Sequence, residues 1–187
     1  IHLLLKAPNG EKVWEQTTTI LPLGTNPLFE TTIKNPILWS PDQPHLYTCE
    51  LTLTTPQSKQ TITESIGFRH FEFIENGPFQ LNGERLLLRG THRHEDHAGV
   101  GAAMTEEQME AEMKLIKEMG VNFIRLGHYQ QSDIILRLCD QLGILVWEEI
   151  PWCRGGLGGE KYQAQARRML TNMITQHRNH PSVILWG

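Results

Sequence analysis

The chain has 187 residues, of which 39% are hydrophobic and 20% are charged, and its formal net charge is -4 at pH 7. This hydrophobic fraction can form a packed core, which argues against an intrinsically disordered chain. The charge gives no concentrated basic surface for nucleic acid, and no apolar run approaches the roughly 20 residues of a membrane-spanning helix. We therefore expect no nucleic-acid partner and no membrane association. Three cysteines at unrelated spacings predict free thiols: Cys49, Cys139 and Cys153.

Residues 1–72 have the pattern of short β-strands. Leu51 and Leu53 alternate with threonines, while 17–20 and 61–63 are β-branched runs bounded by turn residues. Prolines divide the segment and no helical period survives; they stand at positions 22, 27, 36, 41, 44 and 56. The pattern predicts a small β-sandwich.

Strands and helices alternate in the remaining residues. Asn82-Gly83 first predicts a hairpin with a type I′ turn between 79–81 and 85–88. The expected strands cover 86–88, 121–126, 144–147 and 183–186, and the expected helices cover 105–119, 132–142 and 162–177. This order predicts a parallel sheet with right-handed crossovers.

The helix ends carry capping signals. Thr105 and Gln108 have the spacing of a capping box, and Gly120 and Gly143 can close the first two helices. Helical periodicity predicts the inward residues, which are Met109, Met113, Ile116 and Met119 in the first helix, Ile135, Leu138 and Leu142 in the second, and Ala166, Met169, Met173 and Ile174 in the third.

Four parallel strands can begin a doubly wound sheet or form half of an eight-stranded barrel. No Gly-x-Gly-x-x-Gly follows the first strand, and the glycines at 155–159 lack the Lys-Ser/Thr of a phosphate loop. The barrel is therefore favoured. The apolar run Val183–Trp186 would leave a core strand without a neighbour on one side, so we expect the chain to be part of a longer protein.

Polar residues gather where three of these strands end, at 89–97, 125–129 and 147–154. The carboxyl ends of parallel strands carry the chemistry in both architectures, so this asymmetry predicts a site. His92 and His97 could equally be solvated loop residues. Arg125 could instead form a structural salt bridge with Glu148 or Glu149, and these adjacent carboxylates should face opposite ways on a strand.

Two further features leave alternatives open. Trp147 and Trp152 could be core residues, or an aromatic ring at a barrel mouth could stack on a sugar. His92-x-His94 after a first barrel strand is similar to the metal-binding pair of amidohydrolases, which keeps a metal-dependent hydrolase as an alternative.

Several motifs in order resemble glycoside hydrolase family 2, which contains β-galactosidases, β-glucuronidases and β-mannosidases. The run Asn122–Tyr129 with Leu138–Val146 is similar to its first signature, and Arg178–Gly187 is similar to its second. Residues 79–95 resemble the entry into its barrel, and 38–47 with 67–69 resemble its immunoglobulin-like domain.

The resemblance implies a fold and a reaction. It implies an immunoglobulin-like β-sandwich over 1–72, incomplete at its N-terminus, followed over 73–187 by the first half of a TIM (β/α)8 barrel. The expected activity is that of a retaining exo-β-glycosidase, most similar to a β-galactosidase, with a carbohydrate substrate and a homo-oligomeric parent protein. Substrate-binding residues implied by the resemblance are His94, Arg125, His128, Glu149 and Trp152.

The resemblance also implies that the chemistry is incomplete here. The family's general acid/base Glu is expected just beyond Gly187 and its nucleophile on a later strand, so no catalytic residue is assigned and the fragment is expected to be inactive. No cofactor or metal is assigned, because the acidic-plus-His magnesium pattern of classical β-galactosidases is not matched by 150–154. The family usually has Pro where Gln130 stands, which suggests a distinct subgroup. A noncatalytic carbohydrate-binding or scaffold protein stays a further alternative.

Overall fold

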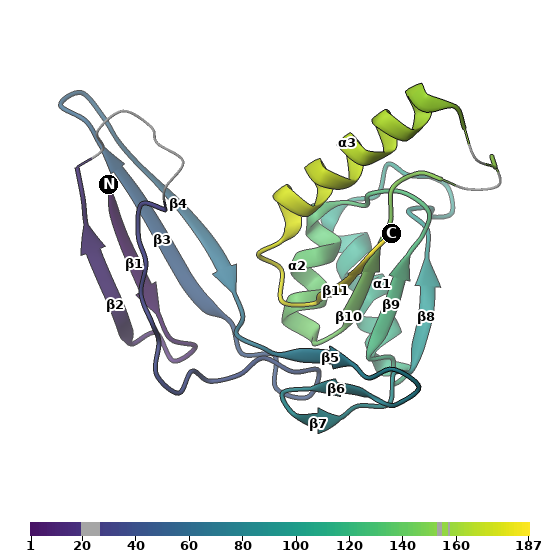
Figure 1. Cartoon of the computed structure of the whole chain (residues 1–187), viewed down its shortest axis with the longest axis horizontal. Coiled ribbons are helices and arrows are strands. Elements are labelled where there is room, and N and C mark those ends of the chain that lie inside the picture. Colours follow the sequence, from purple (N-terminus) through teal and green to yellow (C-terminus); the bar gives the residue numbers. More distant parts are fainter. Residues whose placement is uncertain (20–26, 153–154, 157) are drawn as a thin grey trace.

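The structure, a computed structural model, describes residues 1–19, 27–152, 155–156 and 158–187. An antiparallel sheet lies beside a parallel sheet with three helices, and a small three-stranded sheet lies below them in the view of Figure 1. Within the described ranges, none of the helices is long and apolar enough to cross a membrane.

The N-terminal part contains a four-stranded antiparallel sheet of order β2-β1-β3-β4. Its strands are β1 (His2–Lys6), β2 (Lys12–Thr17), β3 (Tyr47–Thr54) and β4 (Lys59–Ile66). Among the described residues up to Arg69, the structure has this one sheet and an isolated bridge between Leu38 and Phe68, while the expected sandwich would need two facing sheets. The chain between β2 and β3 contacts the sheet through Phe29, whose ring lies edge-on to Trp14 at 5.9 Å. A strand was expected at 17–20, but β2 ends at Thr17 and includes only the first of these residues. Ile20 and Pro22 lie outside the described residues.

A three-stranded antiparallel sheet follows, made of β5 (Phe71–Phe73), β6 (Phe79–Leu81) and β7 (Glu84–Arg85). Asn82 and Gly83 between β6 and β7 have φ values of 54° and 84°, as the predicted type I′ turn requires. Phe79 and Leu81 share a buried cluster with Trp39 and with residues of the parallel sheet. This small sheet therefore joins the two larger parts of the molecule.

The parallel sheet has the order β11-β10-β9-β8. Its strands are β8 (Gly90–Arg93), β9 (Phe123–Leu126), β10 (Leu145–Glu148) and β11 (Val183–Trp186). Three of the four predicted strands are confirmed, but the strand predicted at 86–88 is wrong. Leu86 and Leu88 pack against the Trp39 cluster instead, Leu87 is 64% exposed, and the first parallel strand begins at Gly90.

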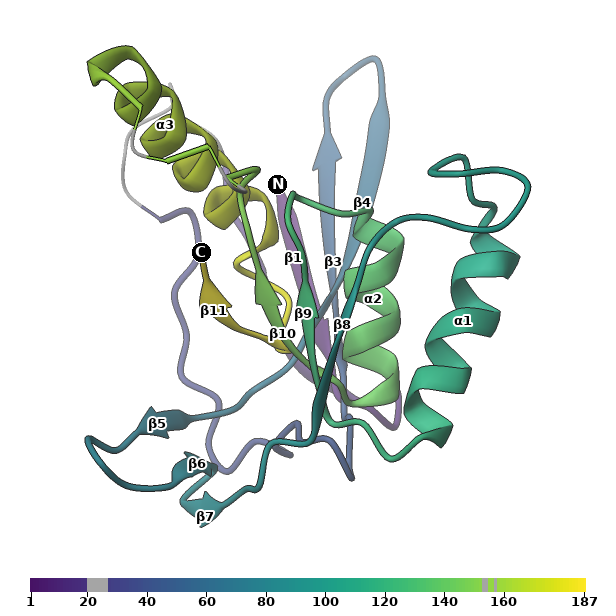
Figure 2. The same cartoon turned by 90° about the vertical axis from the view of Figure 1, so that its right-hand side faces the viewer.

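Three helices follow the parallel strands: α1 (Glu106–Glu118), α2 (Asp133–Leu142) and α3 (Glu160–His177). Figure 2 shows α1 and α2 on one face of the sheet. The capping box of Thr105 and Gln108 is confirmed, and Gly143 closes α2 with a φ of 68°.

The helix faces were mostly, but not fully, predicted. Met109, Met113 and Ile135 are buried against the sheet as expected, whereas Met119 is 74% exposed because α1 ends one residue before it. In α2, the fully buried positions are Ile135, Leu136 and Cys139, while Leu138 and Leu142 are partly buried. Cys49 and Cys139 are free thiols, and Cys153 lies outside the described residues.

Strand alternation decides which side chains face the helices. Ile124, Leu126 and Val146 belong to the core cluster with α1 and α2. Because successive side chains of a strand point to opposite faces, Arg125 and Trp147 lie on the face away from these helices. The sheet thus presents polar groups on its uncovered side.

Candidate active site

Arg125, His128 and Glu149 form a closed cluster at the carboxyl end of β9 and β10. The Arg125 Nε–H donates to Glu149 Oε1, and Arg125 Nη2 lies 3.2 Å from His128 Nδ1. His128 Nδ1 lies 2.9 Å from Glu149 Oε2. The structure thus brings together three of the five predicted site residues from two neighbouring strands.

The environment keeps Glu149 ionised. Burial raises the pKa of its carboxyl, but hydrogen bonds and charge from Arg125 and His128 outweigh burial, so the net pKa lies below its usual value. Both carboxylate oxygens already have partners. Glu149 is therefore suited to hold Arg125 and His128 in place and poorly suited to donate a proton.

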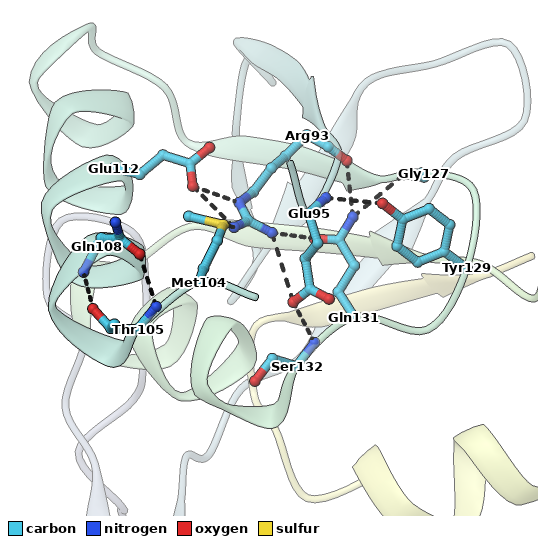
Figure 3. A network of polar contacts seen from close by, with 10 residues as sticks. All are labelled: Arg93, Glu95, Met104, Thr105, Gln108, Glu112, Gly127, Tyr129, Gln131 and Ser132. Atoms are coloured by element: carbon cyan, nitrogen blue, oxygen red, sulfur yellow. Dashed lines mark hydrogen bonds and ion pairs between the residues drawn. The ribbon is translucent and has the colours of Figure 1, made fainter. Parts of the chain in front are cut away.

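His94 joins the cluster through aromatic contacts. Its ring lies 5.3 Å from the His128 ring, nearly edge-on, and 6.0 Å from the Tyr129 ring. The hydroxyl of Tyr129 accepts a hydrogen bond of 2.9 Å from the backbone N–H of Glu95 (Figure 3). The end of β8 is thereby tied to the loop after β9.

A buried arginine fixes this loop from the side of α1. Arg93 donates to Glu112 Oε2 over 2.9 and 3.1 Å, and its Nη1 donates to Gln131 Oε1 over 2.6 Å. Gln131 in turn donates to the carbonyl oxygens of Arg93 and Gly127, as Figure 3 shows. The network holds residues 127–131 against β8. Sequence analysis missed Gln131 and placed Arg93 only within a family motif.

A hollow of about 370 Å³ adjoins the cluster. Arg125, Trp147 and Glu149 form one wall, and Trp152 and α3 residues form the others. The guanidinium of Arg125 lies 4.6 Å from the ring centre of Trp147. Trp152 is 50% exposed and donates its indole N–H to the Gly156 carbonyl over 2.9 Å, so it is not a core residue. The residues that line the hollow combine aromatic surface with charged hydrogen-bonding groups, as sugar binding requires.

Comparison with known proteins identifies the family. The family model described as "Glycosyl hydrolases family 2, TIM barrel domain" matches residues 73–187, and the model described as "Glycosyl hydrolases family 2" matches residues 1–69. The chain belongs to glycosyl hydrolase family 2. Its fold accordingly combines the family's β-rich immunoglobulin-like domain with its TIM barrel domain.

Solved structures and other proteins resemble this family 2 chain over most of its length. The crystal structure of Parabacteroides merdae beta-glucuronidase is 64% identical with a TM-score of 0.95, covering 100% of this chain and 23% of that one. Bacteroides uniformis beta-glucuronidase 3 is also 64% identical, with a TM-score of 0.94 and the same coverage. A beta-galactosidase of Thermoanaerobacter pseudethanolicus is 38% identical over 155 residues, 82% of this chain and 21% of that protein. The chain thus spans about a quarter or less of these relatives.

The described residues do not fit the metal site of classical family 2 β-galactosidases. In the part of the chain that the structure describes, no group of three His, Cys, Asp or Glu side chains could hold a metal ion. Pro151 and Trp152 after β10 offer no ligand, and Cys153 lies outside the described residues. The His92 and His94 rings lie edge-on at 5.9 Å, and both side chains are exposed, as is that of His97.

The two adjacent glutamates face opposite ways, as predicted. Glu149 contacts Arg125 and His128, whereas both oxygens of Glu148 lie 2.9 Å from His177 Nδ1 of α3. Arg125 therefore pairs with Glu149 and not with Glu148. The sequence predicted His177 only as the last residue of a helix. Its position on the inward side of that helix was the one sequence signal that could have marked it as a buried polar residue.

Proposed function

We propose that the protein carrying this chain is a retaining exo-β-glycosidase that hydrolyses terminal β-glucuronides. The observation that supports it most directly is the Arg125–His128–Glu149 cluster at the carboxyl edge of the parallel sheet, beside an aromatic hollow. In this proposal residues 73–187 form the first half of an eight-stranded barrel, and residues 1–72 form the immunoglobulin-like domain.

The proposal assigns a role to each predicted residue. Arg125, His94 and His128 bind the terminal sugar, because arginine offers fixed N–H donors and histidine can donate or accept. Glu149 orients Arg125 and His128 through its two occupied oxygens. Trp152, half exposed on the hollow, stacks on a sugar ring or on the group attached to it.

Retaining hydrolysis needs two carboxyl groups about 5–5.5 Å apart, one to protonate the leaving oxygen and one to form the glycosyl-enzyme. Glu148 and Glu149 cannot be this pair, because they face opposite sides of the sheet and are each bound to other side chains. The family resemblance implies that the two catalytic glutamates follow later strands, and we assign both catalytic carboxylates to residues outside 1–187. Arg125 on the open face could keep such a nucleophile ionised, since a nearby cation lowers a carboxyl pKa.

Similarity supports a glucuronide over a galactoside. Two structures named beta-glucuronidase are 64% identical to the chain, while a protein named beta-galactosidase is 38% identical. The β-galactosidase-like activity expected from the sequence stays the second candidate on the strength of that relative.

A substrate panel tests the proposal. The protein containing this chain should hydrolyse 4-nitrophenyl β-glucuronide with a larger kcat/KM than the matching β-galactoside, and NMR should detect the β-anomer first. A preference for the galactoside would overturn the substrate, and an initial α-anomer would overturn retention.

The 187 residues alone should be inactive on the same panel. The reason is that neither member of the catalytic carboxyl pair is assigned to them. Rapid hydrolysis by this fragment would mean that the carboxylates have been misplaced.

A further inference from the structure

A second polar chain lies behind the candidate site and is made of Glu148, His177 and Gln130. Glu148 is fully buried and His177 is 5% exposed. Both oxygens of Glu148 lie 2.9 Å from His177 Nδ1, and His177 Nε2 lies 3.2 Å from Gln130 Nε2. Gln130 Nε2 also donates to Gln176 Oε1 over 2.9 Å. These three hydrogen-bonded side chains connect the end of β10, the end of α3 and the loop after β9.

The donors and acceptors of this chain fit one tautomer of His177. An ionised carboxylate only accepts hydrogen bonds, so Glu148 requires the proton on His177 Nδ1. The free lone pair of Nε2 can then accept from one N–H of Gln130, whose other N–H goes to Gln176. One arrangement of hydrogen bonds thus connects Glu148, His177, Gln130 and Gln176.

Two of these three residues are close in sequence to members of the candidate site. Glu148 directly precedes Glu149, and Gln130 stands two residues after His128. The buried pair of Glu148 and His177 therefore holds a fixed point from which Gln130 can restrain the loop that carries His128. Gln131, the next residue, restrains the same loop through Arg93 (Figure 3). Between these two restraints, His128 is directed toward Glu149.

We propose, resting on the function proposed above, that Glu148, His177 and Gln130 are positioning residues that hold His128 against Glu149 for sugar binding. They touch neither sugar nor hollow and act through the β9–α2 loop. Loss of the restraint lets His128 move, and small misplacements in an active site can lower turnover by up to about 100-fold. If these three residues only filled space, substituting them would change turnover little.

A double-mutant cycle tests the proposal in the intact protein. His177→Asn and Gln130→Ala should each lower kcat for 4-nitrophenyl β-glucuronide by about 10- to 100-fold. Because both act through one restraint, the double variant should lose no more than the worse single variant. Gln130 is exposed, so its variant should keep the wild-type melting temperature and separate positioning from folding.

His180→Asn is the matched control. His180 also pairs with a buried carboxylate, Asp140 at 2.6 Å, and its ring lies 5.7 Å from that of His177. Its polar partners are Asp140 and Asp133, and it has no contact to the β9–α2 loop among the described hydrogen bonds and ion pairs. We expect its kcat to fall clearly less than that of His177→Asn, because the His180 side chain has no hydrogen bond or ion pair to residues 127–132.

A spectroscopic readout separates failure of this proposal from failure of the proposed function. ¹⁵N NMR should detect the Nδ1-protonated form of His177, and Gln130→Ala should shift the ring signals of both His177 and His128. A wild type that cleaves no β-glycoside would end the proposed function alone. Unchanged His128 signals, or full turnover in both single variants of an active enzyme, would overturn the positioning chain.

Discussion

An arginine, a histidine and a carboxylate lie near each end of the parallel sheet, and the two sets differ in what they bind. At the carboxyl end, Arg125, His128 and Glu149 bind one another and adjoin the hollow. At the amino end, Arg69 donates to the carbonyls of Pro181 and Val183 over 2.6 Å each. His180 and the backbone N–H of Ser182 there bind Asp140.

The difference shows why residue type alone does not identify a site. At the amino end, Arg69 binds two backbone carbonyls and His180 binds the side chains of Asp140 and Asp133. The N-terminal part covers these groups, and the Trp39 indole donates to the Asp140 carbonyl over 2.8 Å. The groups at the carboxyl end bind side chains and keep one face toward the hollow. Substitutions at the amino end should therefore affect stability, and those at the carboxyl end should affect activity.

Trp39→Ala should cause the largest loss of stability. Trp39 is fully buried at the centre of the cluster that joins the two parts, and truncating such a residue costs about 3–5 kcal/mol of unfolding free energy. Trp152→Ala is the control at the other end, where a half-exposed ring should cost under about 1 kcal/mol. Chemical denaturation measures both. Equal losses would break the contrast between the two ends.

Gly143→Ala should be the next most damaging change. A Cβ at Gly143 would lie 2.3 Å from the carbonyl oxygen of Pro41, so the N-terminal part must move away. Gly120→Ala is the matched control, since Gly120 has a similar positive φ but nothing within 4 Å of its Cβ. The control should lose about 1–2 kcal/mol from backbone strain, and Gly143→Ala should lose clearly more. Similar unfolding free energies for the two variants would mean that the backbone at Pro41 can move away from a new Cβ at little cost.

The two ends should respond to pH with opposite signs. Burial raises the pKa of Glu149, but Arg125 and His128 outweigh it and lower the pKa from its ordinary 4.5. Its stabilisation is therefore present above pH 4.5 and is lost as pH falls through the folded pKa. Burial lowers the pKa of His180, but Asp140 and Asp133 outweigh it and raise the pKa from 6.5. That stabilisation is present below pH 6.5 and is lost as pH rises through the folded pKa.

Unfolding of the wild type, Glu149→Gln and His180→Asn across about pH 3 to 9 checks these signs. The deficit of Glu149→Gln should shrink toward acid, and that of His180→Asn should shrink toward base. Two deficits that change in the same direction would contradict the assignment of charges.

Thr105→Ala should have the smallest effect, because its side chain bonds to the backbone N–H of Gln108 and contacts neither set of residues. Loss of this N-cap should cost about 1 kcal/mol of unfolding free energy and leave kcat/KM unchanged. Gln108→Ala removes only the reciprocal hydrogen bond to the Thr105 N–H and should cost less. If Gln108→Ala lost more unfolding free energy than Thr105→Ala, Gln108 would be the more important residue of the capping box, which would contradict this prediction.

Local signals made much of the fold predictable. The caps at Thr105 and Gly143 and the turn at Asn82-Gly83 depend on neighbouring residues alone, and all are present. The strand predicted at 86–88 failed because an apolar run does not say which layer it joins, and here the leucines pack under the sheet. Met119 failed because a helical period does not say where the helix ends.

The candidate site was predictable only in part. Strand ends pointed to the segments that hold Arg125, His128 and Glu149, and the family resemblance singled out these three residues. The opposite facing of Glu148 and Glu149 followed from strand geometry. The restraints behind them were missed because the partners are far apart in sequence. Arg93 is 38 residues from Gln131, and Glu148 is 29 residues from His177. No local pattern announces such pairs.

Exchanging the two arginines for alanine tests the central contrast most directly. In the protein that contains this chain, Arg125→Ala should lower kcat/KM for a β-glucuronide by about 10²–10³-fold, while its loss of unfolding free energy should be smaller than that of Arg69→Ala. Arg69→Ala should keep kcat/KM but lose about 2–4 kcal/mol of stability, because two charged hydrogen bonds to the backbone disappear. Near-normal kinetics for Arg125→Ala, or a comparable loss of turnover for Arg69→Ala, would contradict the assignment of the site to the carboxyl end.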